Sequence, residues 1–199
     1  LDVSFTSGPP VSADSDSLFD VYQEALDDPD PSVFRDDGDT QAALESANAR
    51  IEAVYGMPFL AHLCMEPMNC TALVSDTGVK VWAPTQTNTL AHKIAAEVAG
   101  VNPDKVIVYS TLIGGAFGRR AETDFIRQAV TAAKAVPGRP VKLTWSREED
   151  VQHDMYRPAA VCKMKGGLDK EGNLVALESV LVAQSVVASY NQRTPTARG

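Results

Sequence analysis

The residues best placed to do chemistry lie in the stretch "GGAFGRR", residues 114–120. A run rich in β-branched residues ends at its first glycine, and a segment with helical spacing follows its second arginine. Glycines let a backbone adopt positive φ and approach a ligand closely, and a helix N-terminus offers unpaired N–H groups to an anion such as a pyrophosphate. We therefore predict an anion-binding turn in which Arg119 and Arg120 add charged donors. The alternative is a tight connection between two elements with two solvated arginines.

This stretch matches neither of the two common phosphate-binding motifs. It lacks GxxxxGK followed by Ser or Thr, and it lacks GxGxxG, so neither a P-loop nor a Rossmann site is predicted. The chain also holds no GxSxG motif, and His92 and His153 lie in separate helical contexts. A Ser–His–Asp arrangement is therefore not indicated.

A second candidate is the stretch "WAPTQTNT", residues 82–89, which follows a predicted strand and precedes a predicted helix. A Thr-Gln pair after a strand can direct the amide of Gln86 at a ligand from a rigid element. The alternative is that Thr85 or Thr87 only caps the helix, with Gln86 in its first turn, and capping is the more common role of such a threonine.

A third candidate is "HLCMEPMNCTA", residues 62–72. His62, Cys64 and Glu66 would share one face of an extended segment, which is a pattern that a metal ion can use. The set lacks paired ligand spacing, and Cys64 also fits as a small buried apolar residue. We favour the second interpretation and assign no metal ligand.

Around these motifs, helical and strand-like patterns interleave along the chain. The expected helices cover 18–26, 90–99 up to a stop at Gly100, and 121–135, and a further helix begins at a capping box of Ser146 and Glu149. The expected strands cover 49–59, a hairpin over 71–86 that turns at residues 76–78, a buried strand at 105–111, and the runs 140–145, 157–167 and 173–187. This interleaving predicts a mixed α/β or α+β layer fold.

The acidic charge of the chain is concentrated at its N-terminal end. Residues 1–40 hold eleven acidic residues against Arg35 alone, a net charge of −10, whereas the other 159 residues hold 17 basic and 15 acidic residues, a net charge of +2. Residues 1–39 are also rich in Asp, Ser and Pro, so we expect a linker or edge segment there and a domain over residues 40–199. The chain has no basic stripe interleaved with aromatic residues, which argues against nucleic-acid binding.

Other features exclude several classes of protein. No apolar run approaches the ~20 residues of a membrane-spanning helix, and the acidic start lacks the basic region of a signal peptide. The three cysteines, Cys64, Cys70 and Cys162, form no CxxC pair, so neither a disulfide framework nor an iron–sulfur site is predicted. Because the chain also lacks an initiator methionine, we expect it to be a piece of a longer polypeptide.

The order of the motifs carries more information than any one of them. "HLCMEPMNCTA", then "WAPTQ", then "GGAFGRR" and finally "SREED" resembles the large subunit of molybdenum hydroxylases of the xanthine oxidase family. The resemblance covers about residues 40–199 and is greatest to the isoquinoline 1-oxidoreductase beta subunit and related membrane-associated aldehyde dehydrogenases. It implies a portion of a molybdopterin-binding domain with a mixed α/β fold.

The resemblance also implies a cofactor and the residues that contact it. In that family a molybdopterin, as the cytosine dinucleotide in bacteria, carries a molybdenum with oxo, sulfido and hydroxo ligands. The family's Thr-Gln position implies that Gln86 lies against an oxo ligand. Its Gly-Gly-x-Phe-Gly loop implies that Gly115, Ala116, Phe117 and Gly118 contact the cofactor through backbone N–H groups, with the aromatic ring shaping the pocket.

Two departures from the family pattern limit what it implies. Purine-oxidising members have Gly-Lys-Glu after Phe-Gly, whereas this chain has Arg119, Arg120 and Ala121, so purine hydroxylation is not implied. The family's glutamate base lies in a Gly-x-Gly-Glu motif far toward the C-terminus of the subunit, and this chain contains no such motif. We therefore assign no catalytic residue in this chain.

The resemblance implies a portion of an oxidoreductase that hydroxylates an aldehyde or an N-heteroaromatic carbon with water, and we expect the chain alone to be inactive. The implied partners are the remainder of the large subunit and a small subunit that carries iron–sulfur clusters. The alternative is a non-catalytic ligand-binding or subunit-assembly domain that retains the fold.

Overall fold

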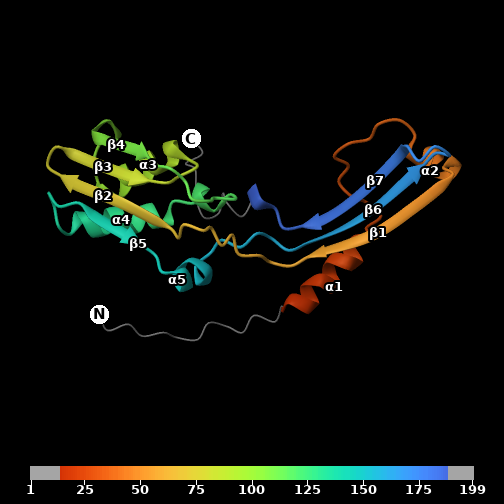
Figure 1. Ribbon diagram of the computed structural model, residues 1–199, viewed down its shortest axis with the longest axis horizontal. Coiled ribbons are helices and arrows are strands. Elements are labelled where there is room, and N and C mark those ends of the chain that lie inside the picture. The colour runs from red at the N-terminus through yellow and green to blue at the C-terminus, as the bar shows by residue number, and fades with distance from the viewer. Residues whose placement is uncertain (1–13, 188–199) are drawn as a thin grey trace. The chain divides into compact units, whose positions relative to one another are not determined.

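The computed structural model describes residues 14–187, which form two compact units of mixed helix and sheet (Figure 1). The first unit comprises residues 14–60 and 158–187, and the second comprises Ala61–Arg157. The predicted mixed α/β class is confirmed. Residues 1–13 of the expected linker lie outside the described residues, and the domain boundary expected between residues 39 and 40 stays a prediction.

The first unit is built on a three-stranded antiparallel sheet of order β1-β6-β7. Its strands are β1 (Ala49–Met57), β6 (Ala160–Leu168) and β7 (Leu174–Ala183). The three strands predicted in these regions are thus confirmed, with ends that differ by a few residues. The central position of β6 gives it neighbours on both edges, so its backbone N–H and C=O groups are paired on both sides.

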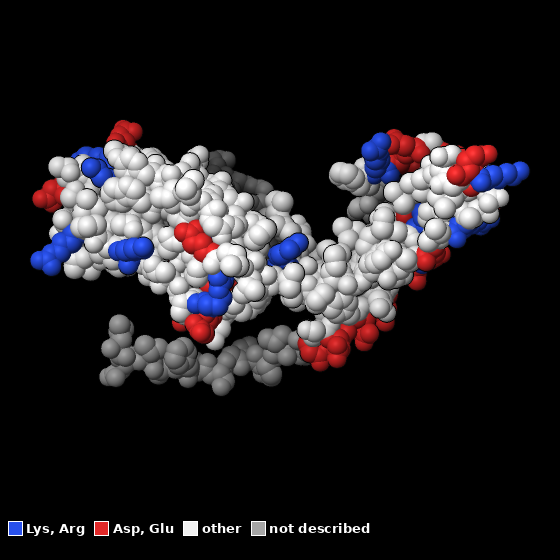
Figure 2. All heavy atoms as spheres, viewed as in Figure 1, with Lys and Arg blue, Asp and Glu red and all other residues white. Residues whose placement is uncertain are grey.

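Two helices accompany this sheet, α1 (Ser15–Ala25) and α2 (Thr40–Ser46). The α1 helix packs Tyr22 and Leu26 against Ala159 and Val161 in a small apolar cluster. Its exposed face carries Asp16, Asp20 and Glu24, and Figure 2 shows acidic side chains gathered on the surface of this helix. The helix predicted at 18–26 is therefore confirmed, and it is amphipathic: one face is apolar and buried and the other is acidic.

The second unit contains a four-stranded sheet of order β4-β3-β2-β5, in which β3 and β4 are parallel and the other pairs are antiparallel. Its strands are β2 (Asn69–Ser75), β3 (Gly78–Ala83), β4 (Val106–Ser110) and β5 (Val141–Thr144). Its helices are α3 (Asn88–Ala99), α4 (Asp124–Lys134) and α5 (Arg147–Gln152), with single 3-10 turns η1 (Pro103–Lys105) and η2 (Arg119–Ala121). The α3 and α4 helices pack on the sheet and on each other and enclose the larger core.

Glycines fix two of the turns in this unit. Gly78, in the β2–β3 hairpin, has a φ of +141°, and a Cβ there would lie 2.3 Å from the Lys105 carbonyl oxygen. Gly100, with a φ of +75°, ends α3 in the left-handed conformation. Only glycine adopts both conformations at low cost, so the hairpin turn and the helix stop predicted from these residues are confirmed.

The strand predicted at 105–111 is not buried as expected. Only Val106 of β4 is buried, and Ile107 and Tyr109 keep 48% and 41% of their surface exposed. The reason is its place in the sheet: within residues 14–187, β4 is an edge strand whose one neighbour is β3. A run of β-branched and aromatic residues fits a pleated strand at an edge as well as in the interior.

Candidate functional site

The loop between β4 and η2 carries the "GGAFG" stretch in an unusual backbone conformation. Gly115 and Gly118 have φ values of +98° and +101°, and Phe117 between them has a φ of +54°. A bulky side chain at positive φ costs on the order of 1–3 kcal/mol and persists only where its surroundings hold it. Phe117 is also 68% exposed as a residue, so its burial does not offset this cost.

Four consecutive backbone N–H groups of this loop have no hydrogen-bond acceptor among residues 14–187: those of Gly115, Ala116, Phe117 and Gly118. The N–H groups on either side are paired, because Gly114 donates to Glu66 Oε2 and Arg119 donates to the Ala116 oxygen. A short run of unpaired N–H groups in a turn with positive φ is a concavity that binds anions or electronegative ligand atoms.

The glycines of the loop serve different purposes. A Cβ on Gly114 would lie 2.5 Å from Glu66 Cβ, so this glycine permits close packing. A Cβ on Gly118 would project into space where the nearest atom is His62 Nε2, 3.8 Å away. Packing within residues 14–187 therefore does not require glycine at position 118, where the φ of +101° is what favours this residue type.

Gln86 lies beside this loop, in the segment that joins β3 to α3. Its N–H donates to the Arg120 oxygen at 3.0 Å, and Thr85 Oγ1 donates to the same oxygen at 3.1 Å. The Gln86 side chain is exposed, and its amide has no partner among the residues that the structure describes. The five residues predicted to contact a cofactor thus lie in adjacent segments.

The capping role considered for the threonines is wrong for Thr87. This residue occupies the N-cap position of α3, yet its side chain makes no capping bond and Thr87 Oγ1 donates to the Ala121 oxygen at 3.0 Å. Thr85 Oγ1 accepts from the N–H of Thr87 at 3.1 Å. Gln86 precedes the helix, which begins at Asn88. Both threonine side chains therefore attach this segment to the turn η2.

The prediction for the two arginines is also wrong in both of its forms. The side chains of Arg119 and Arg120 are 1% and 0% exposed, so they are neither solvated nor available as donors to a ligand outside. The helix expected to follow the glycines directly is replaced by the single turn η2, and α4 begins only at Asp124. The unpaired N–H groups of the loop, rather than a helix terminus or arginine side chains, are what remains to bind an anion.

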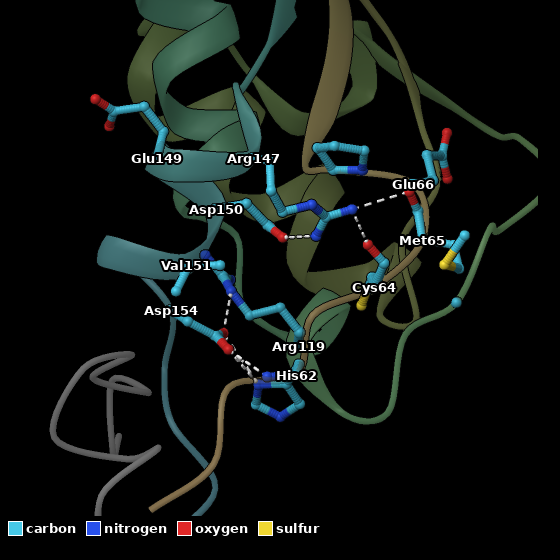
Figure 3. Close-up of polar contacts among 12 residues, drawn as sticks. His62, Cys64, Met65, Glu66, Arg119, Arg147, Glu149, Asp150, Val151 and Asp154 are labelled. Carbon is cyan, nitrogen blue, oxygen red and sulfur yellow. Dashed lines mark hydrogen bonds and ion pairs between the residues drawn. The ribbon is translucent and has the colours of Figure 1, made fainter.

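Arg119 belongs to a buried ionic cluster behind the loop (Figure 3). Its guanidinium makes two hydrogen bonds to Asp124, of 3.0 and 2.7 Å, and Nε lies 3.0 Å from Asp154 Oδ1, an ion pair in which the N–H is not aligned for a hydrogen bond. The guanidinium also lies 5.4 Å from the centre of the Trp145 ring. Burial opposes the charge, but the carboxylates of Asp124 and Asp154 outweigh it and raise the pKa of Arg119.

His62 completes this cluster. Its backbone N–H donates to Asp154 Oδ2 at 2.5 Å, and its Nδ1 lies 3.0 Å from Asp154 Oδ1. Figure 3 shows the imidazole and Arg119 converging on Asp154. Because Nδ1 faces the carboxylate, Nε2 is left on the side of the ring that faces Gly118. His62 therefore forms part of the wall of the space beside the loop.

The metal pattern considered for His62, Cys64 and Glu66 does not form. Leu63 has a φ of +46°, so the segment is not extended. Cys64 Sγ donates to the Ala116 oxygen at 3.5 Å, and Glu66 pairs with Arg120 at 3.0 Å. No group of three His, Cys, Asp or Glu side chains in residues 14–187 is arranged to hold a metal ion.

The α5 helix contacts the segment that carries His62, Cys64 and Glu66. Ser146 Oγ accepts from the N–H of Glu149 at 3.2 Å, which confirms the predicted cap. Arg147 binds Asp150 at 2.6 Å and donates to the carbonyl oxygens of Cys64 and Met65 at 2.5 and 3.0 Å (Figure 3). The sequence indicated the cap of α5 but not this contact, because the two segments are more than 80 residues apart.

Comparison with known proteins shows the family to which this fold belongs. A family model of the molybdopterin cofactor-binding domain matches residues 26–197. The chain belongs to this family.

Within the described residues, no helix is both long and apolar enough to cross a membrane.

Relatives with curated descriptions include two bacterial oxidoreductases. The chain is 31% identical over 180 residues to the membrane-bound aldehyde dehydrogenase of Gluconacetobacter polyoxogenes, whose name specifies pyrroloquinoline quinone. This match covers 89% of this chain and 23% of that protein. It is 32% identical over 147 residues to isoquinoline 1-oxidoreductase subunit beta of Brevundimonas diminuta, over 73% of this chain and 18% of the relative. The resemblance to a molybdenum hydroxylase large subunit is therefore confirmed.

A solved structure supports the fold. The aldehyde oxidoreductase of Desulfovibrio gigas superimposes with a TM-score of 0.60 at 24% identity, over 73% of this chain and 16% of that protein. The chain thus spans less than a quarter of the length of each of these relatives. What the comparisons show directly is a molybdopterin cofactor-binding domain and an origin among oxidoreductases.

Proposed function

We propose that this chain forms part of the cofactor site of a molybdopterin-dependent oxidoreductase that hydroxylates an aldehyde or an N-heteroaromatic carbon, with water as the source of oxygen. The observation that supports it most is the run of four unpaired N–H groups at residues 115–118 beside the exposed amide of Gln86. The names of the relatives, an aldehyde dehydrogenase and an isoquinoline oxidoreductase, favour these two classes of substrate.

The residues present fit a molybdopterin cofactor. The N–H groups of Gly115, Ala116, Phe117 and Gly118 would bind its electronegative atoms, and the Gln86 amide would donate to an oxo ligand. When bound, the cofactor supplies the oxidation of the substrate carbon. The protein contributes donors that are already oriented before the reaction, which is the main way a fixed site stabilises developing charge. Phe117 would exclude water from one side of the pocket.

Other parts of the enzyme lie outside this chain. We infer that the general base is contributed by a glutamate elsewhere in the large subunit, since no Gly-x-Gly-Glu motif is present here. We also infer that the cofactor is the cytosine dinucleotide and that electrons pass to iron–sulfur clusters on a separate small subunit. The 199-residue chain alone is then expected to be inactive and to bind the cofactor weakly.

The test is analysis of the full-length protein that contains this sequence. We expect stoichiometric molybdenum and pterin, release of cytidine monophosphate on acid hydrolysis, and no pyrroloquinoline quinone. Aldehyde oxidation by a preparation that contains pyrroloquinoline quinone and no molybdenum would refute the proposal. A folded, cofactor-free protein whose dye reduction is not restored by loading with molybdopterin would favour the non-catalytic ligand-binding or assembly role instead.

A further inference from the structure

We propose that Arg120 is a positioning residue that holds the loop at 114–118 and Gln86 in the arrangement that receives the cofactor. The ligand named in this inference rests on the proposed function, whereas the bracing itself rests on contacts within the chain. Arg120 does not face the space beside the loop, because its side chain is fully buried. Its effect is therefore exerted through the segments that it binds.

The side chain of Arg120 binds three different segments. Nε donates to the Gly115 oxygen at 2.8 Å, and Nη1 donates to the Pro84 oxygen at 3.4 Å. Nη2 donates to the Glu66 backbone oxygen at 2.6 Å and lies 3.0 Å from Glu66 Oε2. The planar guanidinium offers donors in several fixed directions, which is what a junction of three segments requires.

The main chain of Arg120 adds the second half of this junction. Its carbonyl oxygen accepts from the N–H of Gln86 and from Thr85 Oγ1. The same residue thus holds the glycine loop with its side chain and the Gln86 segment with its backbone. A shift of Arg120 would change the position of both segments predicted to contact the cofactor.

Glu66 extends the brace to the start of the loop. Its backbone N–H donates to the Gly114 oxygen at 3.0 Å, and its Oε2 accepts from the Gly114 N–H at 2.9 Å. Its other carboxylate oxygen accepts from Asn69 Nδ2 at 2.9 Å. Gly114 packs so closely against Glu66 that a Cβ on Gly114 would lie 2.5 Å from Glu66 Cβ.

These contacts orient the free N–H groups of the loop. In a planar trans peptide the C=O and the following N–H point in opposite directions. The oxygens of Gly114, Gly115 and Ala116 are all bound from the protein side, by Glu66 N–H, by Arg120 Nε, and by Arg119 N–H with Cys64 Sγ. The N–H groups of the next residues, Gly115, Ala116 and Phe117, must therefore point away from these partners.

Arg120 is suited to this role by its electrostatic situation. Burial outweighs the attraction of the Glu66 and Asp150 carboxylates and lowers the pKa of Arg120, although an arginine stays charged at any physiological pH. Arg119 lies next to it with the opposite balance, since the carboxylates of Asp124, Asp154 and Glu122 outweigh burial and raise its pKa. The Arg119 guanidinium pairs with acidic side chains, whereas the Arg120 guanidinium donates mostly to backbone oxygens.

The experiment compares Arg120→Gln and Arg120→Lys with Arg119→Gln in the full-length protein. Arg119→Gln is a matched control, because it removes the same charge from an equally buried neighbour whose side chain contacts Asp124, Asp154 and Trp145 but no atom of the loop. For each variant we would measure the thermal unfolding midpoint, the molybdenum content, and hydrogen exchange at the amides of Gly114 and Gln86 in cofactor-free protein. Both amides are hydrogen-bonded within the brace.

We expect Arg120→Gln to speed exchange at both amides by roughly tenfold or more, because buried acceptors lose their donor. For an equal fall in unfolding midpoint, Arg120→Gln should lose far more molybdenum than Arg119→Gln. Arg120→Lys keeps the charge but lacks the guanidinium fork, so it should restore stability more than loading. If the Arg120 and Arg119 variants lose molybdenum in proportion to their unfolding midpoints and exchange equally at the two amides, the positioning role is refuted.

A second variant covers the case in which Arg120→Gln does not fold. Glu66→Gln keeps an acceptor for the Gly114 N–H and removes the charge that faces Arg120, so exchange at Gly114 and Gln86 should still rise, and unchanged exchange would overturn the inference. The exchange data need no cofactor. If the parent protein binds no molybdopterin, the proposed function fails while the brace is tested independently.

Discussion

Replacing Gly118 with alanine separates a loop that binds a cofactor from a loop that only turns. The φ of Gly118 is +101°, a conformation that costs an L-residue roughly 1–3 kcal/mol. The added Cβ meets no atom closer than His62 Nε2 at 3.8 Å, so a steric term within the chain is absent. Strain alone should therefore account for the loss of stability.

The effect on the cofactor should exceed this loss. The Cβ would occupy the space beside the free N–H groups, and one lost hydrogen bond to a charged group is worth about 1.5–3 kcal/mol, or roughly 10- to 150-fold in affinity. The assay is the molybdenum content and the thermal unfolding midpoint of the full-length variant. We expect a protein that is folded at the assay temperature and depleted of molybdenum.

Gly138→Ala is the control for backbone strain. Gly138 has a φ of +80°, and a Cβ there would meet no atom within 4 Å. It lies in the turn between α4 and β5, so it carries the same kind of penalty without facing the loop. If Gly118→Ala and Gly138→Ala lose similar stability and both load fully with molybdenum, Gly118 is only a turn residue, and the assignment of this loop to the cofactor site is refuted.

Three further outcomes can be measured. Gln86→Ala should lower turnover by about 10²–10³ at full molybdenum loading and leave the fold intact, since one oriented donor is lost; unchanged turnover would remove Gln86 from the site. Burial raises the pKa of the Cys70 thiol to about 12, so at pH 8 Cys162 should react with a thiol reagent and Cys70 only after unfolding, and fast labelling of Cys70 in the native protein would contradict its burial. Hydrogen bonding to Lys165 lowers the pKa of Glu178 below its ordinary 4.5, so the stabilisation is present above that value and lost as the pH falls through the folded pKa; Glu178→Gln should therefore flatten the acid limb of the stability curve, and an unaltered limb would show that the pair contributes nothing.

Most of the elements could be predicted from local pattern. Periodicity located the helices and strands, and Gly78 and Gly100 marked turns because positive φ is a local requirement that only glycine meets at low cost. The order of short motifs indicated the family, and through that resemblance Gln86 and the glycine loop were both predicted to contact the cofactor. These are properties of contiguous residues, and contiguous residues are what a single sequence displays.

The burial of Arg119 and Arg120 could not be predicted in this way. Two adjacent arginines beside glycines resemble ligand donors, and the residues that neutralise them are distant in sequence: Glu66 precedes Arg120 by 54 residues, and Asp154 lies beyond two further helices. Only tertiary contacts show that each guanidinium pairs with a carboxylate. The same limit applies to β4, whose apolar run indicated a strand but not that the strand forms an edge.

The paired arginines explain how a loop can be both open and rigid. A loop that presents free N–H groups cannot use those groups to hold itself in place, so its stability has to come from its carbonyl oxygens and from its neighbours. Here the carbonyls of residues 114–116 are bound from the protein side, one of them by Arg120, while Arg119 anchors the following turn to Asp124 and Asp154. Because the two side chains depart from consecutive residues of a 3-10 turn toward different partners, one can fix the loop and the other the turn. Under the proposed function, glycine at 118 and arginine at 120 are complementary requirements: the first leaves space for a ligand, and the second keeps the donors that face this space from turning inward.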